Sequence, residues 1–183
     1  MIAPDVLHRL LADLEPYARL AAAGGLRAAP IEGRDGQGGA SDPQAAADRL
    51  HDRGTLARGR EVYRRLGRMP FAVRPVLLWL SDRGASRPDP RTAARLLAGE
   101  LGPIGLRDRL DTTTRHREAA ARRYAIAGPR RGEPLTVEGA KAHDAMRGAT
   151  TTEQTAEDVL VAWGDAMLCA AAEAWFGNRT SAP

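Results

Sequence analysis

The stretch "LLAGELGPIGLRDRL", residues 96–110, joins two helical patterns through one short turn. Small and apolar residues recur before the turn at the three- and four-residue spacing of one helix face, namely Ala93, Ala94, Leu97, Ala98 and Leu101. Gly102 ends this first helix, and Asp89-Pro90 is a typical helix start. A second helix is predicted from Ile104 to Ala127, where Gly128-Pro129 stops it. The stretch therefore predicts a tight corner between two helices.

The rest of the chain is also predicted to be helical. Ala, Leu and Arg dominate, aromatic residues make up only 4%, and no segment alternates as a strand does. Further helices are expected over residues 43–51 and 55–67 and through the apolar stretch that ends before Gly84. Pro16 should kink or split an amphipathic helix over residues 4–23. We therefore predict an all-α fold.

A long amphipathic helix is expected at the C-terminus. Thr150 with Glu153 and Thr151 with Gln154 fit a capping box, so this helix should begin there, after a short helix over 136–147. Its apolar stripe has two interpretations: packing on its own domain, or self-association as a homodimer. The residues expected to mediate self-association are Leu160, Trp163, Met167, Ala171 and Trp175.

Composition and charge divide the chain into four segments. An N-terminal helix (1–23) and a Gly- and Pro-rich linker (24–42) precede a basic helical domain (43–131), which contains the corner (90–127). An acidic helical region (132–183) follows. Residues 1–52 hold 5 Arg against 8 acidic residues, residues 53–131 hold 19 Arg against 7, and residues 132–183 hold 3 basic against 8 acidic residues.

This segregation of charge favours a polyanion-binding middle segment. The alternative is a fold in which the acidic ends pack on the basic middle and neutralise it. A DNA-binding helix-turn-helix needs a small residue where two helices cross, a glycine in the turn, and a second helix with one buried and one polar side. Ala98 and Gly102 suit the first helix and the turn, while Leu106 and Leu110 should face inward from the second.

Three consecutive stretches resemble region 4 of sigma factors: "YRRLGRMPFAVRPVLLWLSDRG", "RTAARLLAGELG" and "IGLRDRLDTTTRHR". The upstream stretch "SDPQAAADRL", residues 41–50, is followed by an Arg- and Glu-rich helix and resembles the lead-in of phage transcriptional regulators that carry such a module. The resemblance covers residues 41–125 in all, and it implies a transcriptional regulator of phage or prophage origin that binds DNA. RNA polymerase is then a possible protein partner of the acidic C-terminal helices.

The chemistry of DNA recognition assigns roles to the residues around the corner. Arg107 and Arg109 are candidates for bidentate contacts with guanine, and Asp108 or Asp111 could accept a hydrogen bond from cytosine. Thr112 could contact a base or a phosphate. The arginines expected to hold phosphates are Arg91, Arg115, Arg117, Arg122 and Arg123.

Two other functions stay open at this point. A phage DNA-packaging subunit, similar to the small terminase, would also join a helix-turn-helix to an oligomerising helix, but as a ring. A helical interaction module, such as an inhibitor or adaptor, would use the basic middle to bind an acidic protein surface.

The sequence offers little for catalysis, so we expect neither enzymatic activity nor a cofactor. No phosphate-binding loop or nucleophile motif is present, and the four histidines are scattered without metal-ligand spacing. The single cysteine, Cys169, excludes an internal disulfide. There is no run of 18 apolar residues and no secretory signal, so we predict a cytoplasmic protein without a membrane span.

Overall fold

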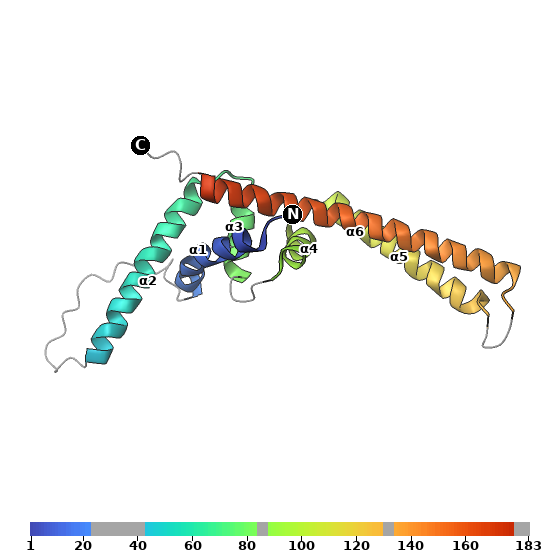
Figure 1. Ribbon diagram of the computed structural model, residues 1–183, viewed down its shortest axis with the longest axis horizontal. Coiled ribbons are helices and arrows are strands. Elements are labelled where there is room, and N and C mark those ends of the chain that lie inside the picture. The colour runs from blue at the N-terminus through green and yellow to red at the C-terminus, as the bar shows by residue number, and fades with distance from the viewer. Residues whose placement is uncertain (23–42, 84–87, 130–133, 178–183) are drawn as a thin grey trace. The chain divides into compact units, whose positions relative to one another are not determined.

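The computed structural model describes residues 1–22, 43–83, 88–129 and 134–177, and all regular structure in these ranges is helical (Figure 1). The all-α class, including a long C-terminal helix, is therefore confirmed. The predicted linker over 24–42 lies outside the described residues. The helices are α1 (Pro4–Ala22), α2 (Pro43–Arg68), α3 (Arg74–Arg83), α4 (Pro90–Leu101), α5 (Ile104–Ala127) and α6 (Val137–Gly177).

The predicted corner has the expected boundaries. Helix α4 begins at Pro90 and ends at Leu101, and α5 runs from Ile104 to Ala127. The backbone N–H of Gly128 donates to the carbonyl oxygen of Tyr124 at 2.7 Å and so closes α5. Proline and glycine at these positions give strong local signals, which explains why the sequence was sufficient here.

Two predicted interruptions are absent: α2 continues through Gly54, and α6 extends without a break across residues 148–150. Helix α1 contains Pro16 and is not split there. The Thr150 and Thr151 hydroxyls do not cap a helix start; they donate to the carbonyl oxygens of Met146 and Arg147, four residues back. The capping-box prediction was therefore wrong, because threonine in a helix interior can bond to the preceding turn.

The chain divides into two compact units whose limits differ from the predicted segments. The hairpin unit comprises Met1 and Arg91–Ala166, and the three-helix unit comprises Ile2–Pro90 and Met167–Pro183. The basic segment predicted over 43–131 is thus shared between the two units, and each unit also receives part of α6.

In the three-helix unit, α1 packs on both α2 and α3, so the N-terminal helix belongs to this core (Figure 1). The predicted apolar stretch of α3 is buried: Val76, Leu77, Trp79 and Leu80 are at most 7% exposed. The leucines of α1 form the other side of the core, namely Leu7, Leu10, Leu11, Leu14 and Leu20. The apolar residues of α3 and the leucines of α1 are thus removed from water, and this burial supplies the main driving force for folding the unit.

Gly59 of α2 lies where the backbones of α1 and α2 approach each other closely. A Cβ atom at Gly59 would lie 2.7 Å from the carbonyl oxygen of Pro16 and 2.7 Å from the Cβ atom of Leu20. We expect Gly59→Ala to lower the free energy of unfolding by about 2 kcal/mol, because α1 must move away. Urea denaturation followed by circular dichroism measures this change.

The control for this prediction is Gly54→Ala, in the same helix. A Cβ atom at Gly54 meets nothing within 4 Å, so the substitution should stabilise the chain by roughly 0.5–1 kcal/mol through a better helix propensity. Equal effects of the two substitutions would contradict the close approach of α1 and α2.

Trp175, near the end of α6, is buried in the three-helix unit and is 1% exposed. Its indole Nε1–H donates to Asp13 Oδ2 at 3.0 Å, and the Arg65 guanidinium lies over its ring, 3.9 Å from the centroid. Arg65 also donates to the Trp175 carbonyl oxygen. Trp175 therefore packs inside its own chain.

The other residues predicted to mediate self-association divide into two groups. Leu160 and Ala171 are buried, at 5% and 0% exposure, whereas Trp163 and Met167 are half-buried. Leu160, Ala171 and Trp175 are thus covered within their own chain, and self-association through this stripe stays a prediction. Periodicity shows which residues share a helix face, but it does not show what covers that face.

A stacked tyrosine pair also links α1 and α2 in this unit. The rings of Tyr17 and Tyr63 have centroids 6.3 Å apart and an interplanar angle of 4°. Burial raises the pKa of Tyr17, and the negative charge of Asp82 and the neighbouring Tyr63 raise it further. The phenol therefore stays protonated, and uncharged, beyond its ordinary range.

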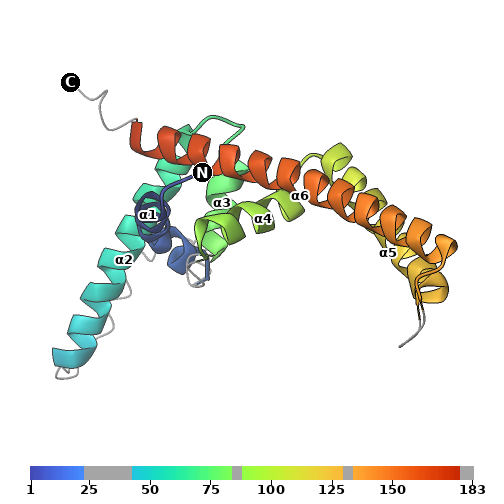
Figure 2. The same ribbon diagram turned by 45° about the vertical axis from the view of Figure 1, so that its right-hand side comes forward.

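The hairpin unit is built on α5 and the first part of α6, which run side by side in opposite directions (Figures 1 and 2). Three contacts fix the register: Arg117 pairs with Glu153, the Tyr124 and His143 rings lie 5.4 Å apart, and the backbone at Gly139 lies against the Ala127 carbonyl oxygen. A Cβ atom at Gly139 would be only 2.7 Å from that oxygen.

The seam between α5 and α6 follows alternating spacings of three and four residues, as in a coiled coil. Half-buried residues of α5 at this spacing are Leu106, Leu110, Thr113, Arg117, Ala120, Tyr124 and Ala127. The facing buried or half-buried residues of α6 are Gly139, Ala142, Met146, Ala149, Glu153, Ala156 and Leu160. Several seam positions hold alanine, threonine or a charged residue, so the sequence does not mark this seam as an apolar heptad pattern.

Candidate nucleic-acid interface

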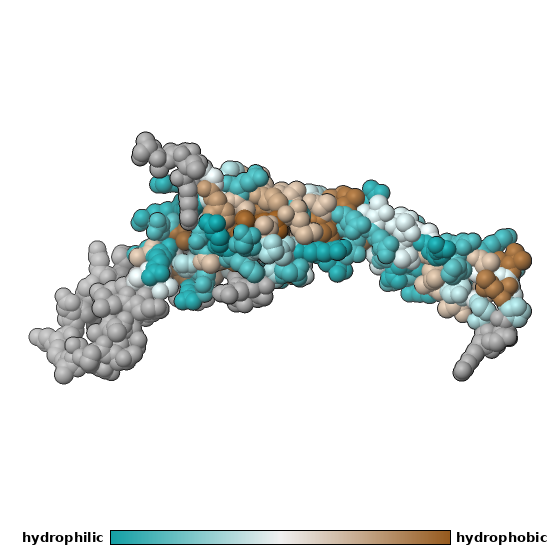
Figure 3. Space-filling model, viewed as in Figure 1, coloured by the Kyte–Doolittle hydropathy of each residue, from teal (hydrophilic) through white to brown (hydrophobic). Residues whose placement is uncertain are grey.

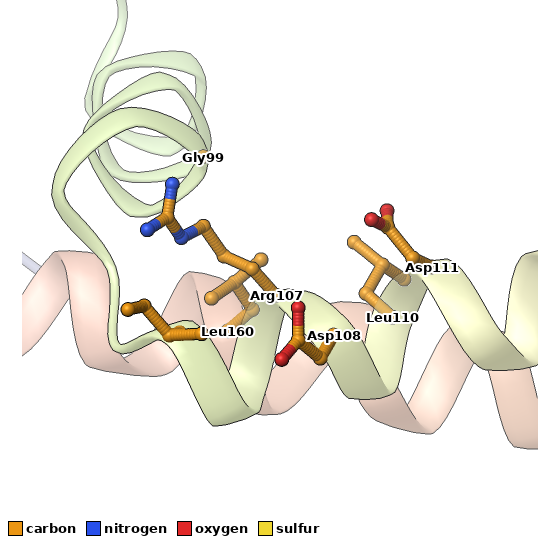
Figure 4. A pocket seen from close by; sticks show the side chains of 7 residues that line it. Gly99, Arg107, Asp108, Leu110, Asp111 and Leu160 are labelled. Carbon is orange, nitrogen blue, oxygen red and sulfur yellow. The ribbon is translucent and has the colours of Figure 1, made fainter.

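The corner between α4 and α5 is a two-residue turn. The Gly102 N–H donates to the Ala98 carbonyl oxygen at 2.9 Å, and the Pro103 carbonyl oxygen accepts from Leu106 and Arg107 at 3.0 and 3.2 Å. A Cβ atom at Gly102 would collide with the Ala98 carbonyl group and lie 3.1 Å from Leu160 Cδ1. The close-up view looks along α4 while α5 and α6 run across it (Figure 4). The turn therefore requires glycine and redirects the chain sharply.

The small residues of α4 serve its crossing with α6. A Cβ atom at Gly164 would lie 2.9 Å from the Ala94 carbonyl carbon and closer still to its oxygen, so the two backbones touch. Ala93, Ala94, Leu97 and Ala98 are at most 1% exposed, as predicted, but Leu101 is 39% exposed. None of the 24 residues of α5 is fully buried. Helix α5 thus lacks the buried face expected of a recognition helix that packs over α4.

Arg107, the first candidate for guanine contact, is half-buried and extends toward α4 near Gly99 (Figure 4). It lines a pocket of about 390 Å³ together with Gly99, Ile104, Asp108, Leu110, Asp111 and Leu160. Its Nε atom is buried and has no hydrogen-bond partner among the described residues. The side chain therefore lies at the corner between α4 and α5, and the predicted base-reading role of Arg107 stays a prediction.

Arg117 is also placed differently from the prediction. Its side chain lies at the α5–α6 seam, 37% exposed, and pairs with Glu153, which is 18% exposed. A phosphate contact by Arg117 would need this internal pair to break. Leu106 and Leu110 are half-buried, and they lie on the seam side of α5.

The other predicted DNA-binding residues are exposed on the surface of the hairpin unit. They are Arg91, Asp108, Arg109, Asp111, Thr112, Arg115, Arg122 and Arg123. The Thr112 hydroxyl donates to the Asp108 carbonyl oxygen at 2.7 Å within its own helix, and Arg122 lies 4.0 Å from Glu118. The arginines Arg109, Arg115, Arg122 and Arg123 together form what we call the outer arginine face of α5.

Part of the segregated charge is neutralised inside the hairpin unit. Arg95 of α4 pairs with Glu157 of α6 at 3.0 Å, and Arg117 of α5 pairs with Glu153. These pairs join the basic middle of the chain to its acidic C-terminal helix. The sequence did not indicate these pairings of Arg95, Glu153 and Glu157, because they depend on which helices meet in the folded unit.

The described residues offer no metal site: no group of three or more His, Cys, Asp and Glu side chains gathers among them. Cys169 is half-buried. By length and composition α6 could cross a membrane, since its most apolar 18 residues have a mean hydropathy of 1.4, and one third of that stretch is buried within the chain. This finding differs from the predicted absence of such a segment. A core helix of a soluble protein passes the same test, so the cytoplasmic location stays a prediction.

The chain matches no known protein family, and no curated protein or solved structure is similar to it. The resemblance to sigma-factor region 4 therefore stays a prediction that rests on the quoted residues.

Proposed function

We propose that the chain is a DNA-binding regulator that contacts the DNA backbone through the outer arginine face of α5. The observation that carries this proposal is the exposure of Arg109, Arg115, Arg122 and Arg123 on one helix. Arg115 and Arg122 are seven residues apart, which places them on the same side, about 10 Å apart along the axis. Arginine in such a row suits phosphate oxygens, which accept its planar set of donors.

Base recognition has fewer candidates than the sequence suggested. With Arg107 turned toward α4, the exposed groups near the corner are Arg109, Asp108 and Asp111. We propose that Arg109 makes the guanine contact and that the remaining arginines set position. The transcriptional role and RNA polymerase as a partner rest on the resemblance alone.

A second candidate function is a helical interaction module. The internal pairs Arg95–Glu157 and Arg117–Glu153 favour it, because they show that the acidic helix takes up part of the basic charge. In that case the exposed arginines would be a solvated surface without a nucleic-acid ligand.

DNA binding measured against salt separates the two candidates. We expect the triple variant Arg115→Gln, Arg122→Gln, Arg123→Gln to weaken binding to duplex DNA and to reduce the log–log salt slope by about 2–3, at roughly 0.9 for each lost phosphate contact. Fluorescence anisotropy with a labelled duplex, titrated between low and moderate salt, gives both values.

A matched control removes three exposed arginines from α2, namely Arg58→Gln, Arg60→Gln and Arg64→Gln. This control changes the net charge equally, so it should leave the salt slope nearly unchanged. If the original chain does not bind DNA even at low salt, the proposal is wrong and the interaction module is favoured. Equal losses in both triple variants would show that only net charge matters.

A further inference from the structure

A second feature of the hairpin unit is a groove between α5 and α6, with a volume of about 550 Å³. Its floor consists of small side chains, and cationic groups stand at its sides. The lining residues are His116, Ala119, Ala120 and Arg123 of α5, and Lys141, Ala142, Ala145 and Ala149 of α6. Alanine on both helices leaves room for large apolar side chains of a bound segment.

The groove continues into exposed apolar side chains at the end of the hairpin. Ile126 is 87% exposed and Val137 is 73% exposed. Ile126 follows Arg123 by three residues, and Val137 precedes Lys141 by four, so both share a helix side with the groove. Figure 3 shows apolar surface at this end of the hairpin. Large apolar side chains this exposed favour a protein-binding surface.

The charge of the groove determines which partner fits. Arg123, Lys141 and His116 are exposed, and within the described part of the chain no ion pair neutralises Arg123 or Lys141. A second copy that docked through the same groove would bring like charges together, which opposes self-association here. A partner with acidic residues beside an apolar stripe would complement both the floor and the sides.

We propose that this groove binds an acidic amphipathic helix of another protein. The apolar stripe of that helix would lie on the alanine floor and against Ile126 and Val137, and its carboxylates would pair with Arg123 and Lys141. This function goes beyond DNA binding: the alanine floor and Lys141 are not part of the outer arginine face, and Arg123 is the one residue that the two surfaces share.

The test uses the full chain and two synthetic probes. One is a fluorescein-labelled 18-residue helix with leucines at i, i+4 and i+7 and glutamates on both flanks; the other has lysines in place of the glutamates. We expect the glutamate helix to bind and the lysine helix not to bind. Binding of both with equal affinity would overturn the proposal, as would binding of neither.

Paired variants on α6 then locate the site. Lys141→Glu with Ala145→Glu should weaken binding of the glutamate helix by about tenfold or more, because acidic groups would face its carboxylates. The matched control, Arg147→Glu with Gln154→Glu, changes exposed residues of the same helix by the same total charge and should change binding much less. Equal losses in the two variants would place the peptide outside the groove.

Two further readouts make the assignment specific. Lys141 is the only lysine of the chain, so carbodiimide cross-linking of the glutamate helix should map to Lys141 by mass spectrometry. Cross-links confined to the N-terminal amine would contradict the proposal. The Lys141→Glu, Ala145→Glu variant leaves Arg109, Arg115 and Arg122 unchanged, so it should weaken binding to duplex DNA far less than binding to the glutamate helix; a parallel loss of both would assign the groove to nucleic acid.

Discussion

Gly164→Ala should lower the free energy of unfolding of the hairpin unit by about 3 kcal/mol, the upper part of the range for added volume in a packed interior. The added Cβ atom would lie 2.9 Å from the carbonyl carbon of Ala94 and closer to its oxygen. Helix backbones are stiff, so neither group can relax as the end of a flexible side chain would. Helices α4 and α6 would therefore have to separate, and the buried contacts of Ala93, Leu97 and Ala98 would weaken.

The matched control is Gly148→Ala, sixteen residues earlier in α6. Nothing lies within 4 Å of a Cβ atom at Gly148, so this substitution should stabilise the unit by roughly 0.5–1 kcal/mol. Urea denaturation with circular dichroism gives both values. If Gly164→Ala were neutral or stabilising, the close crossing of α4 and α6 would be wrong, and with it the description of the corner.

Trp175→Ala is the second substitution with a large expected effect. Removing this 1%-exposed side chain should cost about 3–5 kcal/mol, the usual range for a buried tryptophan. The loss includes the stacking contact with Arg65 and leaves the Asp13 carboxylate without its indole donor. Urea denaturation followed by circular dichroism measures this loss of stability, because the variant should lose its helical signal at a lower urea concentration than the original chain.

Trp175→Phe separates packing from the hydrogen bond. It keeps an aromatic ring and removes the donor to Asp13, so it should cost only about 1 kcal/mol. Light scattering on both variants tests the earlier expectation of self-association through Trp175. A smaller assembly with unchanged stability would place Trp175 at an interface and contradict its internal packing.

Local signals in the sequence predicted much of the fold correctly. Proline and glycine at Pro90, Gly102 and Gly128 gave the limits of α4 and α5, because these residues restrict the backbone wherever they occur. The apolar stripes of α1 and α3 likewise identified buried faces. The same local rules failed at Gly54, through which α2 continues, and at Thr150, where a bond to the preceding turn replaced the expected cap.

The candidate site was less predictable, since its properties depend on which helices meet. Arginines were easy to find in the sequence, but their roles separate only when α5 is placed along α6: Arg117 pairs with Glu153, Arg107 extends toward α4, and the outer arginine face stays exposed. The alanine groove beside Lys141 gave no sequence signal, because alanine is common in any helix.

The amino-acid sequence was thus sufficient to predict an all-α chain, a glycine corner between two helices, and a basic middle between acidic ends. Helix propensity, capping and charge are properties of neighbouring residues, and they can be read along the chain. The pairing of α5 with α6, the crossing at Gly164 and the internal position of Trp175 came from the folded arrangement. These contacts join residues far apart in sequence, and they depend on backbone distance and shape, which no local pattern encodes.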